Sequence, residues 1–134
     1  MTMSIGPSRR KQIDQFLVEE IDSIPQLEAL LLLWRERPRT CSRDEIARAL
    51  YISPETARDV IKHLIHHRLI VEREAGTERY AMLLDSADRE LLVADLAEVY
   101  RRELVRVTNL IHGKASRAVR DFASAFRFKR EERK

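Results

Sequence analysis

Cysteine is nearly absent from this sequence. The 134 residues contain only Cys41, so no disulfide can form within the chain. Three glycines and four prolines are too few for the turns of an all-β fold. No apolar run approaches the roughly 18 residues of a membrane span, and the N-terminal stretch MTMSIGPSRRKQ lacks the apolar segment of a secretory signal. We therefore expect a bacterial, cytoplasmic protein that does not enter a membrane.

Charge is unevenly distributed along the chain, although the net charge is only +3. Residues 1–100 contain 14 Lys and Arg against 18 Asp and Glu, a net charge of −4. Residues 101–134 contain 11 against 4, a net charge of +7. Clustered positive charge is the usual electrostatic feature of phosphate-binding surfaces. The pattern favours a nucleic-acid contact by the C-terminal region, although a solvated helix end would explain the same residues, which include Arg117, Arg120, Arg127, Lys129 and Arg130.

Helix-favouring residues with apolar periodicity are abundant. A strong helix is predicted to begin after Ser23 or Asp22, with Pro25 in its first turn, and to stop at Pro38. It is apolar nearly all round over residues 27–34. A helix that is hydrophobic on every side is normally buried, so we expect this one to form the centre of the core.

Two further helices follow, each with a clear start signal. Ser42 and Glu45 have the S-x-x-E spacing of a capping box, in which each side chain bonds the other residue's backbone N–H. Ser53 and Pro54 then mark the start of the next helix. Helical spacing predicts the inward residues, which are Ile46, Ala47 and Leu50 in the first helix and Ala57, Val60, Ile61, Leu64 and Ile65 in the second.

The pattern then changes from helix to strand and back. Residues 69–83 contain two strand-like runs on either side of the turn residue Gly76. A long helix is predicted over residues 86–112, ended by Gly113, and a last short helix over residues 116–128. The long helix carries a broad apolar stripe made of Leu92, Leu96, Val99, Tyr100, Leu104, Val107, Leu110 and Ile111.

The order of these elements between Thr40 and Leu83 resembles the winged helix-turn-helix of bacterial transcription regulators, as in the MarR-like and related families. The resemblance implies a mainly α fold: a winged helix-turn-helix with a two-stranded β wing and a long C-terminal helical extension. Many relatives have a glycine before the wing, where this chain has Arg68. The residues that carry the likeness are Ser42, Glu45, Ile46, Ala47, Leu50, Tyr51, Ile52, Ser53, Thr56, Val60, Leu64, Leu69, Ile70 and Val71.

The likeness predicts three segments. These are an N-terminal helix in residues 1–22, a winged-helix domain in residues 23–84, and a C-terminal helical extension in residues 85–134. The long helix exceeds what a lone domain of this size needs, and Leu91 and Val105 lie outside its apolar stripe. We therefore expect a homodimer through the C-terminal helix, which would present two reading helices to half-sites about one DNA turn apart. The alternative is that the same surface folds back within one chain.

A helix fits the DNA major groove and reads base edges through its outward side chains. With the apolar stripe inward, the outward face of the second helix holds His63 and most of the candidate reading residues, and Arg73 and Arg79 of the wing could reach the backbone or the minor groove. Acidic residues in this face and in the wing leave an alternative, an adaptor that binds a protein partner and no DNA. The residues predicted to contact double-stranded DNA are Ser53, Glu55, Thr56, Arg58, Asp59, Lys62, His66, Arg73 and Arg79.

Catalytic signatures are missing: there is no G-x-S-x-G, no glycine-rich phosphate loop and no H-E-x-x-H. We therefore expect neither an enzyme nor a cofactor or metal. Asp59, His63 and His67, spaced i, i+4 and i+8, raise a weaker zinc hypothesis, because a third ligand is strained at this spacing. Cys41 could be a redox-sensing thiol beside a helix start or a plain small residue.

Overall fold

The computed structural model describes residues 5–114 and confirms the mainly α winged helix-turn-helix. The predicted last helix and the basic residues beyond position 114 lie outside these described residues. None of the helices within residues 5–114 combines the length and the apolar composition of a membrane span. Residues 104–114 are helical, and the labelled elements are α1 (Pro7–Glu20), α2 (Ile24–Glu36), β1 (Cys41–Ser42), α3 (Arg43–Leu50), α4 (Pro54–His66), β2 (Ile70–Glu72), β3 (Arg79–Met82) and α5 (Ala87–Arg102).

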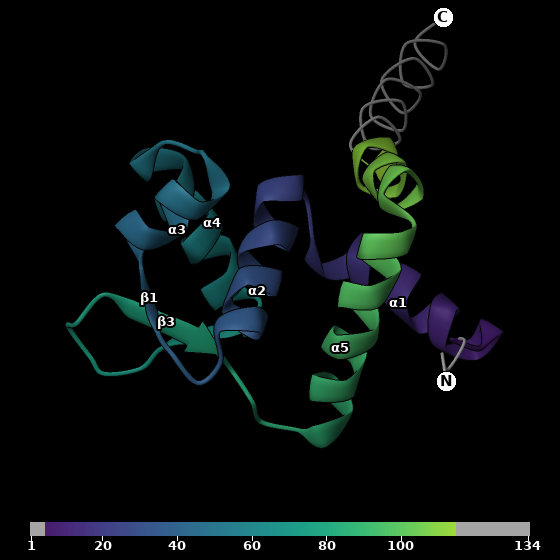
Figure 1. Ribbon diagram of the computed structural model, residues 1–134, viewed down its shortest axis with the longest axis horizontal. Helices are drawn as coiled ribbons and strands as arrows, with labels where there is room; N and C mark the ends of the chain where they lie inside the picture. The colour runs from purple at the N-terminus through teal and green to yellow at the C-terminus, as the bar shows by residue number, and fades with distance from the viewer. Residues whose placement is uncertain (1–4, 115–134) are drawn as a thin grey trace, which may run out of the picture.

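Helix α2 is the central helix, as its apolar sequence predicts. It lies between α3, α4 and the sheet on one side and α1 and α5 on the other (Figure 1). The Ser23 hydroxyl caps it by accepting the N–H of Gln26. Leu27 and Leu30 have no exposed surface, and burying a leucine contributes roughly 1.5–3 kcal/mol. One hydrophobic cluster links α1, α2, the helix-turn-helix, the sheet, α5 and residues 104–114.

The two helices of the helix-turn-helix begin where the capping residues predict. Ser42 Oγ accepts the N–H of Glu45 at 3.1 Å, and Ser53 Oγ accepts the N–H of Thr56 at 3.1 Å. The predicted inward face of α4 is buried at Ala57, Val60, Ile61 and Leu64. The prediction is wrong for Ile65, which is 41% exposed because it faces the base of the wing beside Ile70 and Val71.

The wing is the predicted hairpin of β2 and β3, with Gly76 in its turn at φ 84°. A third strand, β1, was not predicted. It pairs with β3 in the register Cys41↔Tyr80, which gives the strand order β1-β3-β2. Two residues are too few to show the period-2 alternation by which a strand is recognised in a sequence.

The predicted continuous helix over residues 86–112 is wrong at Glu103. Helix α5 ends at Arg102, and Glu103 has φ −125° and ψ 46°, outside the helical range. The helix resumes at residue 104 and continues past Gly113 to residue 114. The break changes which side of the chain meets the core, so Leu104 of the predicted stripe is 52% exposed.

An ion-pair network holds this break against α1. The Arg10 guanidinium donates to Glu103 at 2.7 Å, and Arg106 Nε donates to the same carboxylate at 2.8 Å. Arg106 also bonds Asp14 of α1 at 3.1 Å. The hydrogen bond from Arg10 is the largest reason why the pKa of Glu103 falls to about 2. The backbone at Glu103 is not helical, and ion pairs with α1 and with Arg106 stabilise the chain at this break.

Removing the Glu103 charge should destabilise the fold in a pH-dependent way. A carboxyl group with a depressed pKa stabilises the fold above its unfolded pKa, near 4.5, and loses that contribution as the pH falls towards about 2. We expect Glu103→Gln to lower the melting temperature at pH 7, and the gap from the wild type to close between pH 4.5 and pH 2. Glu98→Gln is the matched control, because the ion pairs that Glu98 forms among the described residues all lie within α5. Equal losses in the two variants at pH 7 would contradict this role for Glu103.

Candidate nucleic-acid interface

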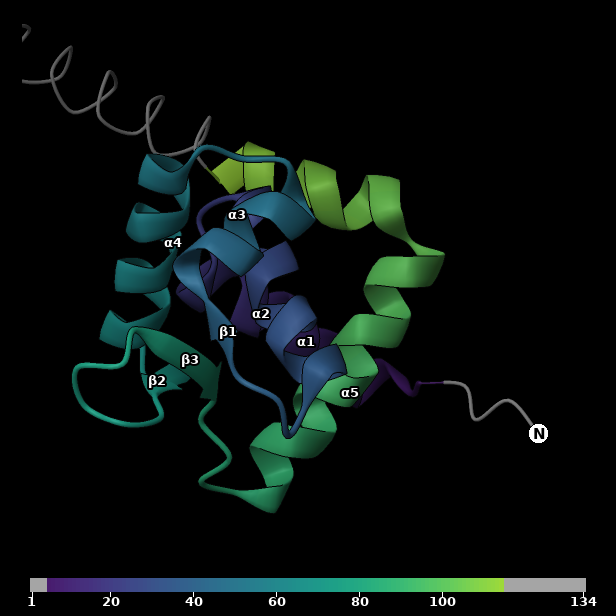
Figure 2. The same cartoon turned by 60° about the vertical axis from the view of Figure 1, so that its left-hand side comes forward.

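Helix α4 runs along one edge of the molecule, with the wing at its C-terminal end (Figure 2). Its apolar residues face the core, so its polar side is directed outward. Arg58, Lys62 and His66 are spaced i, i+4 and i+8 and form a line that we call the basic row. Glu55 and Asp59 form a parallel acidic row. The outward face of α4 therefore presents two adjacent rows of opposite charge.

Every member of the two rows is exposed. Within residues 5–114, Glu55, Arg58, Asp59 and Lys62 form no side-chain hydrogen bond or ion pair, and His66 contacts only the edge of the His67 ring. Glu55 and Arg58, like Asp59 and Lys62, are opposite charges three residues apart, which stabilise an exposed helix by only about a few tenths of a kcal/mol. Since none of these four side chains forms a direct ion pair within residues 5–114, both rows are accessible to a partner.

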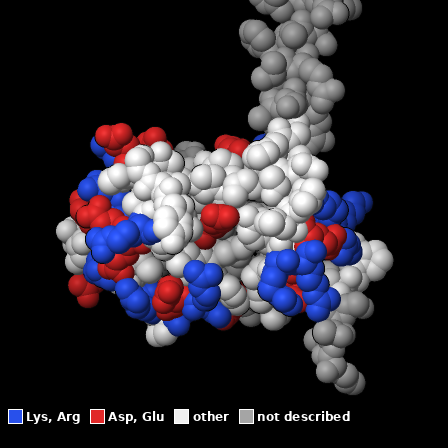
Figure 3. All heavy atoms as spheres, turned by 45° about the horizontal axis from the view of Figure 1, so that its top comes forward, with Lys and Arg blue, Asp and Glu red and all other residues white. Residues whose placement is uncertain are grey.

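The charge around the helix-turn-helix is mixed. Over the end of the molecule that holds α3 and α4, acidic and basic side chains are interleaved rather than separated by sign (Figure 3). A large field of one sign would attract phosphates at long range, whereas interleaved charges act mainly at contact distance. The surface is thus suited to a partner that brings its own pattern of donors and acceptors.

Ser53 and Thr56 lie at the start of α4 and are bonded to each other. The Ser53 hydroxyl accepts the Thr56 N–H and donates to Thr56 Oγ1 at 2.9 Å. Both residues are exposed. Ser53 and Thr56, both predicted to contact DNA, thus lie on the same helix as the two charged rows. The Ser53 hydroxyl already serves as the N-cap of α4.

The two wing arginines have different surroundings. Arg73 is exposed near the tip, where the Glu72 carboxylate accepts the N–H groups of Gly76 at 3.1 Å and Glu78 at 3.0 Å and so braces the turn. Arg79 is anchored instead. Its Nε donates to Thr40 Oγ1 at 2.8 Å, and its Nη2 donates to the Thr40 carbonyl at 2.9 Å. Arg73 is therefore available to a partner, while Arg79 ties β3 to the segment before β1.

The anchoring of Arg79 also explains why the predicted capping box is only half formed. Ser42 caps α3, but Glu45 does not return its carboxylate to Ser42. That carboxylate pairs with Arg79 at 3.0 Å and with Arg39 at 2.6 Å. Two charge-assisted hydrogen bonds are stronger than one bond to a backbone N–H. These two pairs lower the pKa of Glu45 despite the opposing effect of desolvation, which is the largest single contribution.

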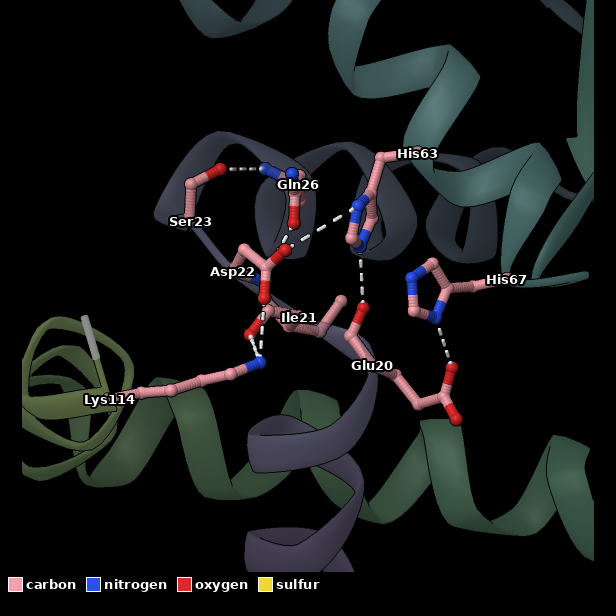
Figure 4. Close-up of polar contacts among 8 residues, drawn as sticks. All are labelled: Glu20, Ile21, Asp22, Ser23, Gln26, His63, His67 and Lys114. Atoms are coloured by element: carbon pink, nitrogen blue, oxygen red, sulfur yellow. Dashed lines mark hydrogen bonds and ion pairs between the residues drawn. The ribbon is translucent and has the colours of Figure 1, made fainter. Parts of the chain in front are cut away.

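His63 was predicted to face outward and does not. Its side chain is only 15% exposed, and together with His67 it points from α4 towards the link between α1 and α2 (Figure 4). His63 Nε2 lies 2.7 Å from the Glu20 carbonyl and His67 Nδ1 lies 2.7 Å from the Glu20 carboxylate. The Glu20 carbonyl and carboxylate oxygens are the acceptors in these two hydrogen bonds, so His63 Nε2 and His67 Nδ1 are the donors. These two histidines attach α4 to the body of the molecule.

The same cluster reaches the last described helix. Asp22 lies 3.8 Å from His63 Nδ1 and accepts a 2.6 Å bond from Lys114 Nζ, which lowers the pKa of Asp22 (Figure 4). The rings of His63 and His67 stack with their centroids 4.1 Å apart. Glu20 thus contacts one ring nitrogen of each histidine. Within residues 5–114, no three His, Cys, Asp or Glu residues are placed to hold a metal ion.

Cys41 is 3% exposed, and burial is the main reason why the pKa of its thiol is raised. A buried thiol with a raised pKa holds little thiolate, the reactive form. The surroundings of Cys41 are therefore those of a small core residue.

A cleft of about 620 Å³ lies between α2, α3 and α5, apart from the outward face of α4. Trp34, Leu50 and Tyr100 contribute to its walls, and the Tyr100 hydroxyl donates to Glu28 at 3.1 Å. Burial, followed by the Glu28 charge, raises the pKa of Tyr100 to about 12. Sequence reasoning did not find this cleft because its walls come from three separate helices.

Comparison with solved structures identifies the fold. The chain is similar to MepR, a transcription regulator of the Staphylococcus aureus multidrug efflux pump MepA, with 16% identity over 89% of this chain and 88% of that chain and a TM-score of 0.51. A MarR family protein from Bacillus stearothermophilus matches with 18% identity over 93% and 84% and a TM-score of 0.50. No family model and no curated protein matches the chain. The molecule has the winged-helix fold of MarR-family transcription regulators.

One of the matching structures contains nucleic acid. It is a mutant S. aureus MepR bound to an oligodeoxyribonucleotide, with 15% identity over 89% of this chain and 88% of that chain and a TM-score of 0.51. The fold described here is therefore one that has been solved with DNA in another protein.

The different surroundings of Arg73 and Arg79 predict different effects of their removal. Arg79→Ala should lower the free energy of unfolding by roughly 1–2 kcal/mol, because it removes several partly buried hydrogen bonds. Arg73→Ala should change it by less than about 0.5 kcal/mol, as expected for an exposed residue. Urea denaturation of the two variants measures both values. A cost for Arg73→Ala that matches or exceeds that of Arg79→Ala would show that the anchoring is unimportant.

Proposed function

We propose that this protein is a dimeric transcription regulator that binds double-stranded DNA with α4 in the major groove. The observation that carries the proposal is the outward face of α4, whose two charged rows are exposed and unpaired within residues 5–114. The winged-helix fold shared with MarR-family regulators, one of them solved with an oligodeoxyribonucleotide, supports it. Exposed donors and acceptors along one helix are what reading of base edges requires.

The two rows would have separate tasks. Arg58 and Lys62 of the basic row can donate to guanine or to phosphates, whereas Glu55 and Asp59 of the acidic row can accept from cytosine amino groups. His66 extends the basic row by one turn towards the wing. Arg73 would reach the DNA backbone or the minor groove beside α4. Contacts from both basic and acidic residues would make binding depend on the base sequence. The acidic residues would also weaken the non-specific attraction of α4 to phosphates.

The extension after α5 supplies a surface for a second copy. Leu104 is 52% exposed and Val105 is 71% exposed, side by side at the start of the helical residues 104–114. Burial of these two apolar side chains against another chain would be favourable, because it removes apolar surface from water. A two-fold dimer through this region would place two copies of α4 on neighbouring half-sites.

The interleaved charge supports a second candidate, a winged-helix adaptor that binds an ionic surface on another protein. Acidic residues are unfavourable beside phosphates, and the acidic row is as exposed as the basic one. The dependence of binding on salt distinguishes the two candidates, because release of counterions from DNA gives a steep slope.

Fluorescence anisotropy with the duplex upstream of the protein's own gene, and with a scrambled duplex, tests DNA binding at several salt concentrations. The wild type should prefer the first duplex and bind more weakly as salt rises. Arg58→Ala/Lys62→Ala should weaken binding at least tenfold and reduce the salt slope by about 1 to 2.

A matched control removes the same charge elsewhere. Arg9→Ala/Lys11→Ala deletes two basic residues of α1, which lies on the other side of α2 from α4 (Figure 1), and should bind like the wild type. If the folded wild type binds neither duplex at low salt, the adaptor becomes the better account.

The mass of the protein in solution tests whether it is a dimer. Leu104→Asp/Val105→Asp should convert a dimer to a monomer in sedimentation equilibrium, because buried carboxylates without partners oppose association. Leu84→Asp is the control, since Leu84 is 47% exposed but lies in the loop between the wing and α5. A wild type that is monomeric at high concentration, or a double variant that remains dimeric, would rule out this interface.

A further inference from the structure

The turn between α3 and α4 contains an unexpected residue. Helix α3 ends in a Schellman motif, in which the Ile52 N–H bonds the Ala47 carbonyl at 3.0 Å. The residue that must adopt the left-handed conformation in this motif is Tyr51, with φ 56° and ψ 43°. Glycine is usual at this position, because a Cβ atom makes the left-handed backbone conformation unfavourable. The backbone geometry alone therefore selects against tyrosine.

The Tyr51 side chain does not offset this cost by packing. It is 96% exposed, the highest exposure among the large hydrophobic side chains described. Arg68 ends α4 in the same way, with φ 57° and a Leu69 N–H bond to the Leu64 carbonyl at 2.9 Å. Arginine is mostly exposed in folded proteins, whereas tyrosine is on average partly buried. A residue that is unfavourable for its backbone and is almost fully exposed among the described residues points to a partner outside the chain.

The position of Tyr51 indicates which part of the partner it meets. It precedes Ser53, the N-cap of α4, by two residues, so it lies at the entry of the reading helix and outside the two charged rows. Residues at this end of a helix in the major groove lie over the edge of the groove, where the phosphates are. Tyrosine there combines a hydroxyl donor with a ring that can lie against the sugar.

We propose that the Tyr51 hydroxyl donates a hydrogen bond to a backbone phosphate at the edge of the groove that α4 enters. The inference rests on the proposed DNA binding and adds a contact that the charge pattern does not reveal. A phosphate contact fixes how the helix sits in the groove and carries no sequence information. A neutral hydroxyl also displaces no counterion, so it contributes affinity without adding to the salt slope.

These properties give the contact a signature different from that of the basic row. Tyr51→Phe removes only the hydroxyl and should weaken binding about five- to tenfold. The loss should be equal for the upstream and scrambled duplexes, and the salt slope should be that of the wild type. Tyr51→Gly should lose at least as much affinity and yet melt a few degrees higher, because glycine relieves the left-handed backbone.

Tyr100→Phe is the matched control for the loss of a hydroxyl. The Tyr100 hydroxyl bonds Glu28 in the cleft between α2 and α5, so its removal should leave DNA affinity unchanged. All four proteins would be compared by anisotropy on both duplexes over a range of salt and by thermal melting.

The outcomes separate this inference from the proposed function. If the wild type binds no DNA, the proposed function fails and the inference fails with it. If the wild type binds and Tyr51→Phe binds equally well, only the inference is overturned. The inference is also overturned if the loss is confined to the upstream duplex, because that result assigns Tyr51 to base reading.

Discussion

Helix α2 is apolar around most of its circumference, and water can be kept from it only if other elements cover it from several sides. The helix-turn-helix and the sheet cover one side, and α1 and α5 cover the other (Figure 1). This requirement gives α4 its orientation, because its buried stripe belongs to the same hydrophobic cluster as α2. The polar side of α4 must then face outward. Exposure of the charged rows thus follows from burial of α2.

Polar contacts refine the arrangement that burial sets up. His63 and His67 hold the inner flank of α4 to Glu20, and Asp22 links this cluster to Lys114. Arg79 holds the wing to the segment before β1. These contacts hold α4 and the wing on the body of the molecule and connect α4 to the last described helix. The proposed DNA binding would require such rigid support, because the surface would have to match the spacing of the DNA grooves.

Much of the fold could be predicted because the deciding signals are local. Ser23, Ser42 and Ser53 each cap the helix that their position predicts, and the stripe from Ala57 to Leu64 is buried as its spacing requires. The left-handed turn at Gly76 is of the same local kind. Once the inward stripe of α4 was known, the remaining residues of the helix could be predicted to face outward.

The remainder depends on contacts between residues distant in sequence. The break at Glu103 is held by Arg10, 93 residues away, and no helix-stop signal marks it. His63 falls on the outward side by spacing alone but is drawn to Glu20, which belongs to another helix. Arg79 looks like any exposed basic residue until β1 brings Thr40 beside it. Tyr51 is conspicuous only once its backbone angle and exposure are known.

In the proposed function, α4 reads the sequence of duplex DNA with a face of mixed charge. Selection from a random duplex library by the wild-type protein, followed by sequencing of the bound fraction, is the decisive measurement. Sequence reading by two copies of α4 should enrich a two-fold symmetric site whose halves are about one helical turn apart. A bound fraction with the same sequence composition as the starting library would contradict it.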